Sequence, residues 1–177
     1  MVSFNHRLGL SVDLDYSNGT EFANKIYGYL RANVTQLLYV CKQRRDFYLC
    51  MRDMYSSCVN QFYLLSLPGT TLTNVLDYVR VLAQLDFMCN AGFEEVVNQY
   101  GSLLGASNSQ EYQKCQKDYG TSMGSKPEAR CSNTNDFMKC AQQAFSKYCE
   151  NKAAGWWICE DLRLSYANDC PDLRCNV

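Results

Sequence analysis

The sequence predicts an all-α fold, a bundle of five to seven helices stapled by disulfide bonds, with an extended N-terminal arm. Two observations predict this class: apolar residues recur at helical spacing along most of the chain, and many of its 11 cysteines fall on those helical stretches. The 177 residues are 47% hydrophobic and include 13 Tyr and 8 Phe, which indicates a packed core. We expect residues 1–19 to form the arm and residues 20–177 a single disulfide-rich domain, with the halves 20–105 and 106–177 as the alternative.

The arm is predicted from an alternation of apolar and polar residues. Leu8, Leu10, Val12 and Leu14 alternate with glycine, serine and aspartate, which is the period of an extended strand. One face of the arm should therefore be buried.

Two long helices are predicted after the arm, over about 20–41 and 45–64. The second is the most regular, and Pro68-Gly69 follows its end. One apolar face of this helix is traced by Phe47, Cys50, Met51, Met54, Cys58 and Phe62.

The rest of the chain also favours helices. A third helix begins at Leu72 and breaks near 90–92 before a further helical segment. A short helix near 111–118 precedes a loop over 120–133, because glycine, serine and Pro127 oppose regular structure there. Two final helices and a tail held by two cysteines complete the fold.

The cysteines indicate disulfide bonds and an extracellular protein. The sequence has no C-x2-C pair and a single histidine, which excludes the common zinc, iron–sulfur and thioredoxin patterns, and reducing compartments seldom contain so many thiols. We expect Cys175 to be the unpaired one, free or bonded to a second copy in a covalent homodimer. The cysteines expected in intrachain bonds are Cys41, Cys50, Cys58, Cys89, Cys115, Cys131, Cys140, Cys149, Cys159 and Cys170. Two sequons, at Asn18 and Asn33, fit passage through the secretory route.

Helix geometry restricts the pairing. Cys140 and Cys149 are nine residues apart on one predicted helix, which separates them by about 13.5 Å along the axis, so they cannot bond to each other. Each should reach a different neighbouring element. Cys50 and Cys58 lie on nearly the same face of their predicted helix, so both should bond to cysteines on one side of that helix.

An offset of 90 residues aligns two parts of the chain. Cys41-x4-Asp46-Phe47-x2-Cys50 matches Cys131-x4-Asp136-Phe137-x2-Cys140, while Cys58 and Cys149 fall one residue out of step. This pattern suggests duplication of a helical unit. Chance self-alignment of a helical, cysteine-rich sequence is the alternative.

The sequence shows no catalytic, metal or cofactor signature. His6 lies outside the predicted core, so catalysis by a histidine base has no obvious candidate. A pair of acids could serve a glycosidase, although solvated helix surface accounts for them more simply. The acids considered are Glu94, Glu95, Glu160 and Asp161. We expect no cofactor and no metal.

Charge and hydropathy restrict the partners. The net charge of −1 gives no overall positive field for nucleic acid, and no stretch approaches the roughly 18 apolar residues of a membrane span. Trp156 and Trp157 should point about 100° apart on a helix, so that one fills the core while the other faces outward or lines a pocket. Together with Tyr29 and Tyr55, they are the candidate contacts for a ligand or partner.

The C-terminal third resembles the helical, cysteine-rich domains of unknown function in secreted proteins of nematodes and other invertebrates. The resemblance is carried by Cys131-x8-Cys140-x8-Cys149, Trp156-Trp157-x-Cys159 and Cys170. It implies an extracellular, disulfide-bonded helical domain and no catalytic residues. From the sequence we expect a secreted, non-catalytic binding protein for a protein partner or a small apolar ligand. A cofactor-independent enzyme with an active site in a helical cleft is the alternative.

Overall fold

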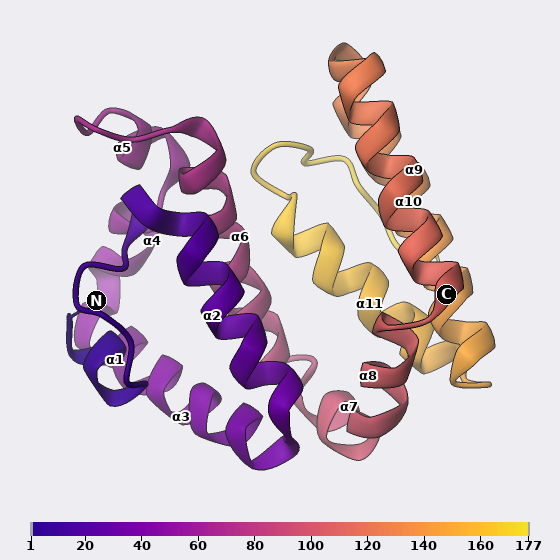
Figure 1. The fold of residues 1–177 in the computed structure, drawn as a ribbon, viewed down its shortest axis with the longest axis horizontal. Coiled ribbons are helices and arrows are strands. Elements are labelled where there is room, and N and C mark those ends of the chain that lie inside the picture. The colour runs from indigo at the N-terminus through magenta and orange to yellow at the C-terminus, as the bar shows by residue number, and fades with distance from the viewer. Residues whose placement is uncertain (1, 177) are drawn as a thin grey trace. The chain divides into compact units, whose positions relative to one another are not determined.

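The computed structural model describes residues 2–176 and is all-α, as predicted (Figure 1). Met1, in the predicted arm, and Val177, at the end of the predicted domain, lie outside the described residues. The chain divides between Cys89 and Asn90 into two compact units, whereas the sequence predicted a single domain, with halves divided between 105 and 106 as the alternative. Within residues 2–176 there is no strand, and several of the eleven α-helices are shorter than the predicted ones.

The first unit is built on three long helices. Helix α2 (Gly19–Ala32) packs against α3 (Val34–Met51) and against α6 (Leu72–Met88). Asn33 separates α2 from α3, because its side-chain Oδ1 accepts a hydrogen bond from the Gln36 amide at 2.9 Å and so caps α3. The shorter elements are α1 (Val2–Arg7), η1 (Tyr16–Asn18), η2 (Arg52–Met54), α4 (Tyr55–Cys58) and α5 (Gln61–Leu65).

The N-terminal segment is not the extended arm that the alternation predicts. Residues 2–7 form α1, and the following residues turn back on it because the Asn5 Nδ2 donates to the carbonyls of Ser11 at 3.0 Å and Leu14 at 2.6 Å. Leu8 and Leu14 are buried, whereas Val12 is exposed. Local side-chain hydrogen bonds therefore take the place of a strand partner.

The predicted helix over 45–64 is also wrong, because the chain breaks at Arg52. Arg52 has a φ of 46°, a left-handed conformation that ends α3. The chain then continues as η2, α4 and α5 instead of one straight helix (Figure 1). This break changes which apolar side chains are buried.

The second unit consists of α7 (Phe93–Asn98), α8 (Tyr100–Ser107), α9 (Gln110–Ser125), η3 (Pro127–Ala129), α10 (Arg130–Tyr148) and α11 (Lys152–Ser165). Helix α10 packs against both α9 and α11. The predicted loop over 120–133 is wrong, because α9 continues to Ser125, where the Ser125 hydroxyl donates to the Thr121 carbonyl at 3.0 Å. Trp157 fills the core and donates its indole Nε1–H to the Gly92 carbonyl at 3.0 Å.

Four disulfide bonds cross-link the helices and the segments that follow them, and they differ in part from the prediction. They are Cys41–Cys89 in the first unit, and Cys115–Cys140, Cys131–Cys170 and Cys159–Cys175 in the second. Cys175 is thus bonded within the chain and gives no link to a second copy.

Three cysteines expected in bonds are free thiols. Cys149 reaches no neighbouring cysteine, although it is correctly predicted not to bond to Cys140, and Cys50 and Cys58 do not join their helices to another element. For Cys50 and Cys58, the break at Arg52 destroys the shared helical face on which the pairing prediction depended.

Candidate functional site

Exposed apolar side chains concentrate on one stretch of the first unit. Phe62 is 71% exposed and Met54 is 60% exposed, fractions that are unusual for side chains of this size in a packed domain. We call this stretch the α3–α5 apolar surface, and its residues are Tyr48, Leu49, Met54, Phe62, Tyr63 and Leu65. Two of its residues lie near the end of α3, Met54 lies in η2, and the other three lie in α5, so the name denotes this stretch of the chain.

Helix α5 turns three of these side chains outward. Asn60 caps it, with Oδ1 accepting hydrogen bonds from the amides of Phe62 at 3.0 Å and Tyr63 at 3.2 Å. Gln61 and Leu64, three residues apart, are the buried face, and α5 packs against α6. The opposite face of this short helix therefore presents Phe62, Tyr63 and Leu65 to solvent.

A buried arginine supports the end of α3. Arg44 is only 4% exposed and pairs with Asp86, while its guanidinium carbon lies 5.1 Å from the ring centre of Tyr48. The Tyr48 and Tyr55 ring centres are 5.2 Å apart and the ring planes are inclined at 60°, an edge-to-face arrangement that is favourable for aromatic pairs. Burial raises the pKa of Tyr55, partly opposed by the positive charge of Arg44. These contacts fix the backbone from which Tyr48 and Leu49 project.

The predicted contact residues are not brought together into one site. Tyr29 donates its hydroxyl to the Leu8 carbonyl and so holds the N-terminal turns in place. Tyr55 is half-buried and contacts one residue of the apolar surface, Tyr48. Trp156 and Trp157 belong to the second unit, where Trp157 is buried and Trp156 is half-buried and lines a groove, as predicted for adjacent indoles.

Most of the α3–α5 apolar surface was missed in the sequence, because Met54 and Phe62 fit the face of a longer helix. The available signal is Asn60, a good N-cap that lies within that predicted helix. Because a new helix begins after its N-cap Asn60, Phe62 is exposed, whereas the longer predicted helix placed it on the buried face.

Two of the acids considered for catalysis are hydrogen-bonded to neighbouring side chains. Glu160 binds Arg163 through Nη2 at 2.7 Å, and Glu95 accepts a hydrogen bond from Gln99. Glu94 is exposed on α7, Asp161 is buried in α11, and His6 is exposed. Among residues 2–176, no group of three potential ligands could hold a metal ion.

Both sequon asparagines are exposed, Asn18 as the last residue of η1 and Asn33 between two helices. Asn33 uses Oδ1 in its cap, which leaves the glycan-accepting Nδ2 outside that bond. Glycosylation at both positions remains a prediction.

The fold and its surface thus define an all-α, disulfide-bonded protein with an exposed apolar surface on its first unit. Comparisons with known protein families, curated proteins and solved structures find no match. Within the described part of the chain, no helix has the length and hydropathy to cross a membrane.

Proposed function

We propose that the chain is an extracellular, non-catalytic binding protein that recognises a protein partner through the α3–α5 apolar surface. The observation that supports this proposal is the concentration of Tyr48, Leu49, Met54, Phe62, Tyr63 and Leu65 on one short stretch. Aromatic and methionine side chains are enriched at the centres of protein interfaces.

The form of this surface favours a protein over a small apolar ligand. A carrier of small ligands would enclose them in a largely apolar cavity. Phe62 and Tyr63 instead extend into solvent from a helix whose other face is anchored by Gln61 and Leu64. Side chains so exposed suit burial beneath a second macromolecular surface.

The support beneath the surface favours tight recognition. The contacts of Arg44 with Asp86, Tyr48 and Tyr55 hold the end of α3, so less conformational freedom is lost on binding. The four disulfide bonds are typical of proteins that fold in an oxidising compartment, which supports the extracellular assignment.

A paired comparison tests the proposal. Wild-type protein, the double variant Phe62→Gln/Tyr63→Gln and the control Leu38→Gln are immobilised and exposed to extracellular fluid of the source organism. Leu38 is 42% exposed on α3 and lies outside the α3–α5 apolar surface. Leu38→Gln therefore also replaces an exposed apolar side chain by glutamine, but at a position that should not contact the partner. Proteins retained by the wild type and the control, but not by the double variant, are then purified and titrated.

We expect the double variant to weaken binding of the purified partner by at least about tenfold, because interface aromatics carry a large share of binding energy. Equal affinity of the double variant and the wild type would contradict the proposal. Equal losses in the control and the double variant would contradict the location of the site.

A further inference from the structure

A groove in the second unit carries positive charge, amides and one indole. It lies between the C-terminal half of α10, the beginning of α11 and the tail residue Asn176, with a volume of about 1010 Å³. Its lysines are Lys139, Lys147 and Lys152. No described lining residue is acidic, so the described lining carries positive charge although the whole chain has a net charge of −1.

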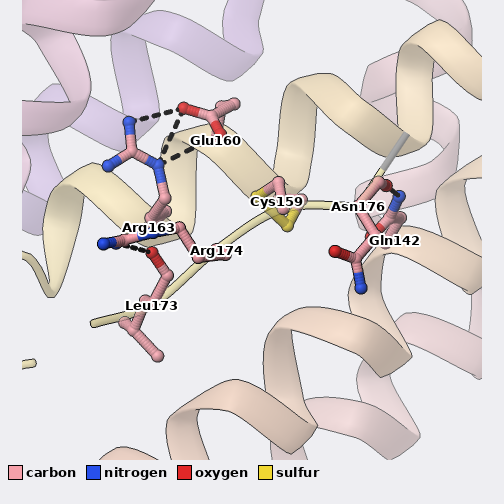
Figure 2. The surroundings of a disulfide bond; sticks show 8 residues. Gln142, Cys159, Glu160, Arg163, Leu173, Arg174 and Asn176 are labelled. Carbon is pink, nitrogen blue, oxygen red and sulfur yellow. Dashed lines mark hydrogen bonds and ion pairs between the residues drawn. A yellow bond between two sulfur atoms is a disulfide. The ribbon is translucent and has the colours of Figure 1, made fainter.

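Two features build the wall of the groove formed by the tail. The Cys159–Cys175 bond ties the tail to α11, and the Gln142 Nε2 donates to the Asn176 carbonyl at 2.6 Å, which ties it to α10 (Figure 2). Asn176 is thereby held at the groove by two different helices. The site is therefore part of the folded unit.

The lysines are available to a ligand. Lys147 contacts Glu111 at 3.0 Å, but both side chains are more than half exposed, and such a surface pair is weak. Within residues 2–176, Lys139 and Lys152 have no ion-pair partner. Lys139 and Lys147 are eight residues apart on α10, so about 12 Å of helix separates them, which suits an extended ligand with several negative groups.

The remaining lining residues suit a ligand that is rich in hydroxyl groups. Gln142, Gln143 and Asn176 carry amides that both donate and accept hydrogen bonds, and Ser146 adds a hydroxyl. Half-buried Trp156 offers an indole, whose negative face attracts the C–H face of a sugar ring. Apart from Trp156, Ala153 is the only apolar residue in the described lining, and the other residues end in a polar or charged group.

From these observations we propose that the α10–α11 groove binds an acidic saccharide, a sugar chain bearing sulfate or carboxylate groups. The lysines pair with the anionic groups, the amides bind hydroxyls, and Trp156 stacks on a ring. The proposal is independent of the α3–α5 apolar surface, which belongs to the other unit.

Calorimetry with low-molecular-weight dextran sulfate tests this site, with neutral dextran, polyglutamate and inorganic sulfate as comparison probes. We expect dextran sulfate to bind most tightly and its affinity to fall as salt screens the lysines. Polyglutamate binding as tightly as dextran sulfate would overturn the proposal in favour of an acidic peptide. If inorganic sulfate bound as tightly as dextran sulfate, the groove would be a simple anion site, and this result would also overturn the proposal.

Variants locate the binding. Lys139→Gln/Lys152→Gln should weaken dextran sulfate binding about tenfold or more because two charge-assisted contacts are lost, and Lys139→Arg/Lys152→Arg should retain it. The matched control is Lys117→Gln, which removes an exposed lysine of α9 outside the groove and should have little effect. Trp156→Ala should also weaken binding. Unchanged affinity in the glutamine double variant or in Trp156→Ala would overturn the assignment.

Discussion

Gly155 of α11 lies directly against the backbone of Gln142 in α10. A Cβ atom added at Gly155 would stand 2.6 Å from the Gln142 carbonyl oxygen, closer than packed atoms allow. The missing side chain therefore permits the close packing of the two helices that border the groove. Gln142 contributes to the same site by its hydrogen bond to Asn176.

Gly155→Ala should destabilise the second unit by about 1–3 kcal/mol, because the overpacked backbone must separate. Helix propensity alone would predict stabilisation by up to about 1 kcal/mol, so the clash decides the sign. Gly120→Ala is the matched control, since Gly120 lies within α9 with no atom within 4 Å of the added Cβ. Urea denaturation should show opposite shifts for the two variants, and stabilisation by Gly155→Ala would refute the close packing.

Removing the tail bond with Cys159→Ser/Cys175→Ser should lower the free energy of unfolding of the second unit by about 3 kcal/mol. The estimate follows from chain entropy for a sequence separation of 16. Cys41→Ser/Cys89→Ser, with a separation of 48, should cost the first unit about 4 kcal/mol. Chemical denaturation checks both values, and no loss in either variant would contradict the pairing.

The all-α class could be predicted because long amphipathic helices produce a recognisable periodicity of apolar residues in the sequence. The prediction failed where one residue decides the path of the chain: Arg52 ends α3 in a left-handed conformation, and Asn5 folds the N-terminal segment by binding two carbonyls. Both effects depend on local geometry that periodicity does not encode.

The cysteine pairing could be predicted only in part, for a similar reason. Spacing along one helix correctly excluded a Cys140–Cys149 bond, but the choice of partner depends on which helices become neighbours. The predicted duplication stays a prediction. The aligned residues Cys41 and Cys131 both bond to a cysteine beyond a later helix, Cys89 and Cys170, but Cys50 is a free thiol whereas its counterpart Cys140 is bonded to Cys115.

The first unit should lose stability at alkaline pH. Burial raises the pKa values of Tyr55 and Tyr78 above the ordinary value of 10.0. In the unfolded chain, these phenols lose protons near pH 10, whereas in the folded chain they keep them to higher pH. Their contribution is therefore complete below pH 10 and is lost as the pH rises further. In protein whose free thiols have been alkylated, Tyr78→Phe should reduce the loss of unfolding free energy between pH 9 and about 11. An unchanged loss would contradict the assignment of this pH dependence to Tyr78.

The three free thiols should react with iodoacetamide without prior reduction, and Cys149 more slowly than exposed Cys50. Cys149 is half-buried, and burial, together with the nearby negative charge of Glu95, raises the pKa of its thiol. At a fixed pH of about 8, the reactive thiolate at Cys149 is correspondingly scarce.

Glu95→Gln should speed the alkylation of Cys149, because removing the carboxylate charge lowers the pKa of that thiol. Glu94→Gln on the same helix is the control. Mass spectrometry of the alkylated peptides follows each site. Labelling at Cys175 in the native protein would contradict the Cys159–Cys175 bond, and an unchanged Cys149 rate in Glu95→Gln would remove Glu95 as a cause.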